Sequence, residues 1–335
     1  MFFSAGPPHR VPGPAAWIGV RPSRRSREEG WTMPEVEVQP TAAQVRRLLE
    51  AQLPRELRGL LDLTPTPVAQ GWDNALFRLG PAHAVRLPVR RAAVPCLLHE
   101  VRWTAVAGAP LAALGIAVPR PVFRGGPGAG YPRPWSVVRW IEGEAVATLP
   151  VARRGRLAED LARALSSLHR PAPGEAPRNP YRGVPLDARL RAAPPSWPAA
   201  AAVLGARRTE RLRGVVDDGL RAAPWLRSAV WLHGDPHPWN LVHRGGRLAG
   251  LVDFGDVCAG DPASDLAGAW LAFDADQRSG FRAVADSTGR YDDDVWRRAA
   301  AWAALYVAAL AASPGAGPDF GPVLRHAAAQ LTPAS

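Results

Sequence analysis

Apolar residues recur along the chain in patterns typical first of one helix and then of short strands. A helix that Thr41 can cap is predicted through about residue 53, and its apolar face consists of Val45, Leu48, Leu49 and Leu53. The runs TPVAQ, NALFRLG and AHAVRLP that follow are short and separated by turn residues, which predicts an antiparallel meander. PCLLHEVRWTAVAGAPLAAL is predicted to be helical, and IAVPRPVFRG and WSVVRWIEGE are predicted to be strands.

The second half of the chain is mainly helical by the same criteria. The predicted elements are a helix over 151–169, a proline-rich irregular stretch over 171–200, a helix over 201–222, two short strands joined by Gly245 and Gly246, and helices after Pro262. A small β-rich lobe followed by a larger helical lobe predicts an α+β fold with a ligand cleft at the junction. We place the first lobe at 39–143 and the second at 144–335.

The first 38 residues differ from the rest. They are rich in Pro, Gly, Ser and Arg and show no periodicity, which predicts a disordered extension. They contain no long apolar stretch, so a signal peptide is not predicted. Ordered sequence begins just after Met33, which we interpret as the true start of the protein.

Composition narrows the function classes. The formal charge is +11, but all 41 basic residues are arginine and they are spread over the whole chain, so a nucleic-acid partner is not predicted. Cys96 and Cys258 lie far apart and outside any C-x-x-C pair, which fits a reducing cytoplasm rather than a disulfide scaffold. No apolar run reaches about 18 residues, so no membrane partner is predicted. A monomer and a dimer both remain open.

The stretch WLHGDPHPWNLV carries the candidate chemistry. Asn240 follows Asp235 by five residues, and Asp253 lies 13 residues after Asn240, beyond the predicted hairpin. Protein kinases have this order of catalytic aspartate, metal-binding asparagine and metal-binding aspartate. Mg²⁺ prefers oxygen ligands, and phosphoryl transfer needs a carboxylate that accepts the proton of the attacking hydroxyl. Asp235 is therefore the candidate base, and Asn240 and Asp253 are the candidate magnesium ligands.

Neighbouring polar residues have alternative explanations. His233 and His237 suggest a zinc site only if a third ligand exists, and His233 is expected to bond the backbone instead. Asp261 is expected to cap the helix that Pro262 opens, and Asp265 to brace the catalytic loop through backbone N–H groups. Cys258 is expected to be a small buried apolar group.

The motif H-G-D-x-H-x-x-N and the stretch VDFGDVCAGDPASDLA resemble the aminoglycoside phosphotransferase family. This family has a protein-kinase-like fold and also includes choline and homoserine kinases; the resemblance covers roughly residues 60–310. It implies two lobes, a small antiparallel sheet followed by a larger helical lobe. It also implies transfer of phosphate from ATP or GTP to a hydroxyl, with Mg²⁺ as cofactor, Asp235 as catalytic base, and Asn240 and Asp253 as magnesium ligands.

The resemblance also assigns the first lobe to the nucleotide. AQGWDNALFRLG stands where the family covers the phosphates, with Gly71 and Asn74 as candidates, although it lacks the G-x-G-x-x-G pattern. HAVRLP stands where kinases have a lysine, so Arg86 must supply the phosphate-binding cation, with Glu100 as its partner. An ordinary surface ion pair is the alternative for these two residues.

WSVVRWIEGE looks like the hinge strand that holds the adenine, with Val138 and Trp140 as candidates. Its side chains do not separate ATP from GTP.

The acceptor is less well determined by the sequence. A polycationic aminoglycoside needs an acidic pocket, for which Asp274, Asp276 and the run 292–294 are candidates, although that run also suits a helix N-terminus. The insert 175–222 is rich in arginine and argues against a strongly acidic cleft. An aminoglycoside or other antibiotic, with a role in resistance, and a metabolite of the choline or homoserine kind remain open. The departure at Arg86 keeps a second class open, a kinase-like binding protein without catalysis.

Overall fold

The computed structural model describes residues 36–70, 73–313 and 317–333. The start predicted at Met33, nearly all of the extension predicted at 1–38, and Gly71 lie outside these described residues.

A five-stranded antiparallel sheet forms the first lobe, with strand order β1-β2-β3-β5-β4. Its strands are β1 (Pro65–Gln70), β2 (Asn74–Leu79), β3 (His83–Pro88), β4 (Pro121–Gly125) and β5 (Trp135–Arg139). The predicted meander is confirmed, because β1 pairs with β2 and β2 with β3. Helix α2 (Ala42–Gln52) begins at Thr41, whose Oγ1 accepts the N–H of Gln44 at 3.2 Å. Its buried face, Val45, Leu48 and Leu49, joins the core of this lobe.

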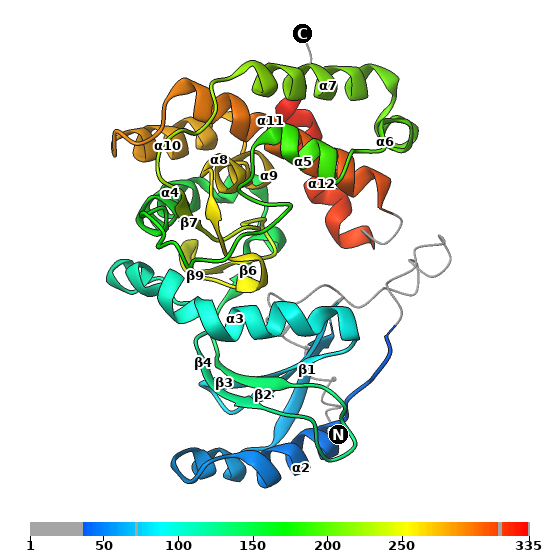
Figure 1. Ribbon diagram of the computed structural model, residues 1–335, viewed down its shortest axis with the longest axis vertical. Coiled ribbons are helices and arrows are strands. Elements are labelled where there is room, and N and C mark those ends of the chain that lie inside the picture. The colour runs from blue at the N-terminus through cyan, green and yellow to red at the C-terminus, as the bar shows by residue number, and fades with distance from the viewer. Residues whose placement is uncertain (1–35, 71–72, 314–316, 334–335) are drawn as a thin grey trace, which may run out of the picture.

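Helix α3 (Val94–Ala107) lies between the sheet and the second lobe, whereas α2 lies on the far side of the sheet (Figure 1). We predicted one helix over 95–114, and this is wrong at its C-terminal end. The α-helix ends at Ala107 and a 3-10 turn, Ala109–Leu114, follows it. Pro110 has no N–H to continue the α-helical bonding, which accounts for the break.

The second lobe is mainly helical and surrounds one long buried helix. Its helices are α4 (Gly155–Leu168), α5 (Leu186–Ala192), α6 (Trp197–Leu204), α7 (Ala206–Arg221), α8 (Ala263–Leu266), α9 (Gly268–Ala272), α10 (Ala275–Asp286), α11 (Asp293–Ala312) and α12 (Gly317–Leu331). Helix α11 packs against α7, α12, α8 and α6 and buries most of its alanine-rich surface. Among the helices of the described ranges, none combines the length and the apolar character needed to cross a bilayer.

We predicted that the stretch 171–200 is irregular, and this is wrong for part of it. It contains α5 and the start of α6. Pro185 is the N-cap residue of α5 and Pro198 lies in the first turn of α6. Proline is well tolerated at these positions because the first N–H groups of a helix have no intrahelical acceptor. The high proline content therefore marks helix starts here as well as loops.

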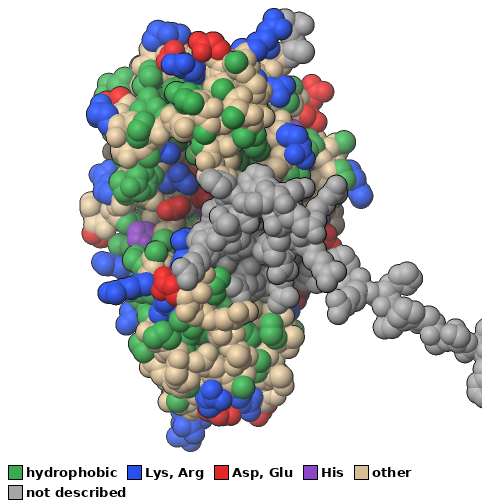
Figure 2. Space-filling view, turned by 90° about the vertical axis from the view of Figure 1, so that its right-hand side faces the viewer, with side chains coloured by type: hydrophobic (Ala, Val, Ile, Leu, Met, Phe, Trp, Pro, Cys, Tyr) green, Lys and Arg blue, Asp and Glu red, His purple; other side chains and the backbone are tan. Residues whose placement is uncertain are grey.

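Short strands in the second lobe carry the candidate motif. They are β6 (Glu144–Ala145), β7 (Val230–Leu232), β8 (Leu241–Arg244), β9 (Arg247–Leu251) and β10 (Cys258–Gly260). The hairpin β8–β9 is confirmed, and its turn residues Gly245 and Gly246 have φ of +59° and +76°, which favour glycine. The α+β class and the two lobes are likewise confirmed, and the waist between the lobes carries acidic, basic and histidine side chains (Figure 2).

Candidate active site

The loop 233–240 leaves β7 through a turn that requires glycine. Gly234 has φ of +91°, and a Cβ there would lie 2.3 Å from the carbonyl oxygen of Asp256. A side chain at this position would therefore clash with the backbone that follows Asp253. The glycine of His-Gly-Asp thus allows the two halves of the motif to approach each other.

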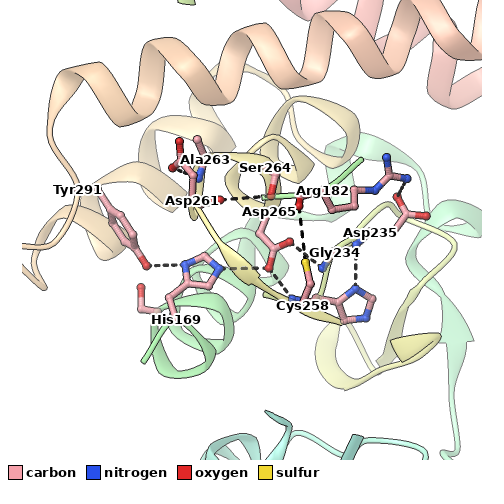
Figure 3. A network of polar contacts seen from close by, with 12 residues as sticks. His169, Arg182, Gly234, Asp235, Cys258, Asp261, Ala263, Ser264, Asp265 and Tyr291 are labelled. Atoms are coloured by element: carbon pink, nitrogen blue, oxygen red, sulfur yellow. Dashed lines mark hydrogen bonds and ion pairs between the residues drawn. The ribbon is translucent and has the colours of Figure 1, made fainter. Parts of the chain in front are cut away.

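Asp265, on α8, fixes the start of this loop by hydrogen bonds to its backbone. Its carboxylate accepts the backbone N–H of His233 at 2.7 Å and that of Gly234 at 2.9 Å, the contacts that we expected of it. It also lies 3.2 Å from His169 Nε2, and His169 Nδ1 lies 2.8 Å from the hydroxyl of Tyr291 (Figure 3). Sequence reasoning missed His169 and Tyr291, because nothing near them in the chain links them to the motif.

The two histidines of the motif contact neighbouring backbone groups. His233 donates from Nε2 to the carbonyl of Val252 at 2.9 Å and accepts the N–H of Asp235 at Nδ1 at 3.3 Å, so both ring nitrogens are engaged. His237 Nδ1 accepts the N–H of Trp239 at 3.2 Å, and burial lowers the pKa of its imidazole. Across the described ranges, no group of three or more His, Cys, Asp and Glu side chains is arranged to hold an ion by itself.

Asn240 and Asp253 are brought together by the base of the hairpin. The N–H of Val252, next to Asp253, donates to the Asn240 carbonyl at 3.0 Å. The side-chain Nδ2 of Asn240 donates to the carbonyl of Asp235 at 3.0 Å, which leaves Oδ1 as the oxygen available for a cation. Asp253 adopts a left-handed conformation with φ of +63°, and its carboxylate is half-exposed. An amide oxygen and a carboxylate fit magnesium, which usually takes one or two such protein ligands and completes its shell with phosphates and water.

Arg86 connects the sheet to this site. It forms an ion pair with Glu100 of α3, and its Nη2 lies 3.2 Å from the Asp253 carboxylate. Burial lowers the pKa of the guanidinium, but the charges of Glu100 and Asp253 outweigh this and raise it. Burial also raises the pKa of Asp253, and the charge of Arg86 reverses this shift, so that the pKa lies below its ordinary value. The Arg86–Glu100 contact is thus a buried ion pair and not the surface pair of the alternative reading.

The three candidate nucleotide contacts in or next to the strands, Asn74, Val138 and Trp140, all contact other parts of the first lobe. The side-chain amide of Asn74 lies against the Arg86 guanidinium, and with its oxygen turned toward Arg86 it accepts from Nε at 3.2 Å. The backbone N–H of Trp140 donates to Ala82 at 2.9 Å, which commits this main-chain donor to the sheet. Val138 is buried beside Trp140 in a small apolar cluster of the sheet.

Comparison with known proteins agrees with this arrangement. Residues 64–306 match the model of the phosphotransferase enzyme family, APH. The chain belongs to this family. The resemblance inferred from the motifs is therefore confirmed, although no curated protein sequence matches this family member significantly.

Solved structures of phosphotransferases share the fold of this APH-family chain. The GDP and kanamycin complex of APH(2")-IIia has 16% identity and a TM-score of 0.55, over 85% of this chain and 98% of that chain. Macrolide 2'-phosphotransferase MphH from Brachybacterium faecium has 19% identity and a TM-score of 0.53, over 84% and 98%. APH(3'')-Id from Streptomyces rimosus has 20% identity and a TM-score of 0.51, over 81% and 99%. At these identities the likeness confirms the kinase-like fold.

On the other side of Asp235, the APH-family chain has an arginine that sequence reasoning missed. Arg182, from the proline-rich stretch, lies 3.5 Å from the Asp235 carboxylate (Figure 3). It also lies 3.9 Å from the carboxylate of Asp256. Asp256 also accepts from Asn179 Nδ2 at 2.8 Å. Only the arginine content of the insert signalled this contact, and it did not single out Arg182.

A cavity of about 170 Å³ opens beside Asp235. It is lined by Arg182, Arg189, Gly234, Asp235, Pro236, Ser264, Gly268, Leu271, Trp302, Leu305, Tyr306, Ala309, Leu310 and Ser313. This cavity, the acceptor cavity below, is the space next to the candidate base.

The predicted acidic acceptor residues do not line this cavity. Asp274 is the N-cap of α10, where it accepts the N–H of Gln277 at 3.0 Å in a capping box, and Asp276 lies exposed in the first turn. In the run 292–294, Asp292 caps α11 and the next two carboxylates pair with arginines. The helix-terminus explanation therefore accounts for the run, and the structure gives Asp274 a helix-capping contact.

Proposed function

We propose that this protein transfers the γ-phosphate of ATP or GTP to a hydroxyl group of a small molecule, with Mg²⁺ as cofactor. The observation that carries the proposal is one hydrogen-bonded frame that holds Asp235, Asn240 and Asp253. Asn240 bonds the carbonyl of Asp235, and Val252 bonds the carbonyl of Asn240. The family match and a fold relative with bound GDP and kanamycin support the nucleotide and the hydroxylated acceptor.

The proposed chemistry assigns each group a task. Asp235 orients the acceptor hydroxyl in the acceptor cavity and takes its proton as the oxygen attacks phosphorus. His233 fixes the backbone of Asp235 through its Nδ1. Asn240 and Asp253 would hold the magnesium ion, which neutralises phosphate charge when bound.

The nucleotide side of the proposal rests on Arg86. Its buried guanidinium, positioned by Glu100, would contact the phosphates in place of the kinase lysine. Gly71, Asn74, Val138 and Trp140 stay predicted nucleotide contacts.

The alternative, a binding protein without catalysis, has weaker support. The reason for considering a binding protein was the arginine at position 86, where kinases have a lysine. That arginine nevertheless joins Glu100 to Asp253, so the cation still connects the nucleotide lobe to the metal-ligand candidates. The complete set of candidate groups favours the enzyme.

Replacement of the base tests the proposal. Asp235→Asn should lower turnover by about 10²–10⁴-fold, because the proton acceptor is lost while the shape of the side chain is kept. The measurement is transfer of labelled γ-phosphate from ATP and from GTP, with Mg²⁺, to a panel of hydroxylated antibiotics and metabolites. Asp276→Asn, an exposed carboxylate on α10, is the matched control and should keep wild-type turnover.

A second readout separates chemistry from folding. Thermal unfolding with Mg²⁺ and each nucleotide should show the same stabilisation of wild type and Asp235→Asn. Full turnover by Asp235→Asn would refute the proposed base. Nucleotide binding without transfer to any acceptor by the wild type would favour the binding protein.

A further inference from the structure

The acceptor cavity carries a charge that a polycationic aminoglycoside does not match. We propose that the acceptor is a small hydroxylated carboxylate whose carboxylate group binds Arg189 while its hydroxyl lies at Asp235. This inference rests on the proposed function and names the chemical class of its acceptor.

Arg182 and Arg189 both line the acceptor cavity, but their surroundings differ. Arg182 is balanced by two carboxylates, those of Asp235 and Asp256. Arg189 forms no ion pair with any carboxylate in the part of the chain that the structure describes. Its positive charge is therefore available to an anion in the acceptor cavity.

The hydrogen bonds of Arg189 point the same way. Its Nη1 donates to the carbonyl of Ala193 at 2.5 Å, and its guanidinium lies 5.9 Å from the ring centre of Tyr181. Its Nε is buried and has no hydrogen-bond partner among the described residues. With Nη1 bonded to Ala193 and Nε buried, the guanidinium presents Nη2 to a carboxylate in the acceptor cavity, where a charge-assisted hydrogen bond would form.

The rest of the cavity suits a compact, partly apolar molecule. Trp302, Leu305, Tyr306 and Leu271 supply the apolar wall. A volume of about 170 Å³ is below the roughly 300 Å³ at which pockets for drug-sized ligands begin. A single ring or short chain that carries one hydroxyl and one carboxylate fits these limits.

The charged groups that line the acceptor cavity are unfavourable for a polycation. Among the described residues that line the cavity, Asp235 is the only acid, and it already faces Arg182. The guanidinium of Arg189, which no carboxylate of the described residues balances, would repel the ammonium groups of an aminoglycoside. The arginine-rich insert 175–222, whose composition argued against a strongly acidic cleft, thus supplies both arginines of the acceptor cavity.

The test compares acceptors that differ only in charge. The probes are 3-phenyllactate with 3-phenyllactamide, and shikimate with its methyl ester, beside kanamycin as the polycation. We expect the full-length protein with Mg²⁺ and ATP or GTP to phosphorylate or bind at least one acid at least tenfold better than its uncharged analogue. Arg189→Ala should remove this preference and raise KM for the acid at least tenfold, with a smaller change in kcat. Arg191→Ala, which changes an exposed arginine of the same helix paired with Asp187, is the matched control and should keep the preference.

Binding measured by calorimetry without nucleotide separates this inference from the proposed function. If an acid binds the wild type but not Arg189→Ala, and no transfer occurs, the acceptor class holds and the phosphotransferase proposal fails. If transfer occurs to kanamycin but to neither acid, or if acid and uncharged analogue are used equally, the acceptor class is overturned while the phosphotransferase proposal stands. Absence of any Arg189-dependent binding of either acid also overturns it.

Discussion

The two sides of the loop 233–240 are built differently. On the inner side, Asp265, His169 and the backbone of His233 are fully buried and bonded at 2.7–3.2 Å. On the outer side, Asp235 and Arg182 are partly exposed, and their contact is 3.5 Å long. The groups that fix the backbone thus have their hydrogen bonds satisfied within the protein. The groups that would meet ligands are partly exposed and can still form contacts with a ligand. The comparison teaches that stability and chemistry lie on opposite sides of one short loop.

Loss of the inner carboxylate should have the largest effect on stability. Asp265→Ala leaves the N–H groups of His233 and Gly234 buried without an acceptor, which should cost roughly 2–6 kcal/mol of unfolding free energy. Urea unfolding measures this, with Asp276→Ala as the exposed control that should change stability by less than about 0.5 kcal/mol. An Asp265→Ala protein as stable as the control would break the distinction between the two sides.

Loss of the outer arginine should affect activity much more than stability. Arg182→Ala should change the unfolding free energy by at most about 1 kcal/mol, because its ion pairs are long and partly exposed. Turnover should fall about tenfold or more, since Asp235 loses the cation that orients it. Steady-state kinetics and urea unfolding on the same preparation check both values, and Arg182→Lys should restore part of the activity. A loss of several kcal/mol would instead assign Arg182 to the inner, structural group.

A smaller loss of stability than at Asp265 should come from the contact that anchors the hairpin to α4. Asp160 of α4 accepts from Arg247 at 2.7 and 2.9 Å and from the N–H of Leu248 at 3.2 Å. Burial raises the pKa of Asp160, but the hydrogen bonds from Arg247 and Arg163 and from the Leu248 N–H lower it below its usual range. Asp160→Asn should therefore cost about 1–2 kcal/mol near neutral pH.

The pH dependence of that cost has a definite sign. A carboxylate whose pKa is lower in the folded state stabilises the fold above its unfolded pKa, about 3.9. The difference between wild type and Asp160→Asn should therefore be constant near neutral pH and shrink as the pH falls through the lower, folded value. Urea unfolding from about pH 7 to pH 3 measures it, and a difference that grew on acidification would contradict the assignment.

Local patterns predicted much of this molecule. The strand meander, the β8–β9 hairpin and the two lobes follow from periodicity and turn residues, which act over a few positions. The frame of Asp235 and Asn240 is also local, since one hydrogen bond joins residues five apart. Helix ends were harder: α3 stops at Ala107 where the apolar pattern continues.

The rest of the site depends on contacts between distant parts of the chain. Asp265 meets His169 across 96 positions, and Arg182 meets Asp235 across 53, with no periodic signal that pairs them. The acidic candidates illustrate the converse case. Asp274 bonds the N–H of Gln277, three positions away, and so serves the helix that it precedes.

The bond from Val252 to Asn240 closes the hairpin at its base, and this affects how related sites should be searched for in other sequences. The spacing between Asp235 and Asn240 is fixed, because the amide of one side chain must reach the carbonyl of the other residue. The spacing between Asn240 and Asp253 is not fixed in this way, since the turn at Gly245 and Gly246 lies at the open end. Lengthening that end costs only about 0.6 kcal/mol for each doubling of a flexible loop. A sequence pattern for this kind of site should hold the first interval constant and leave the second one variable.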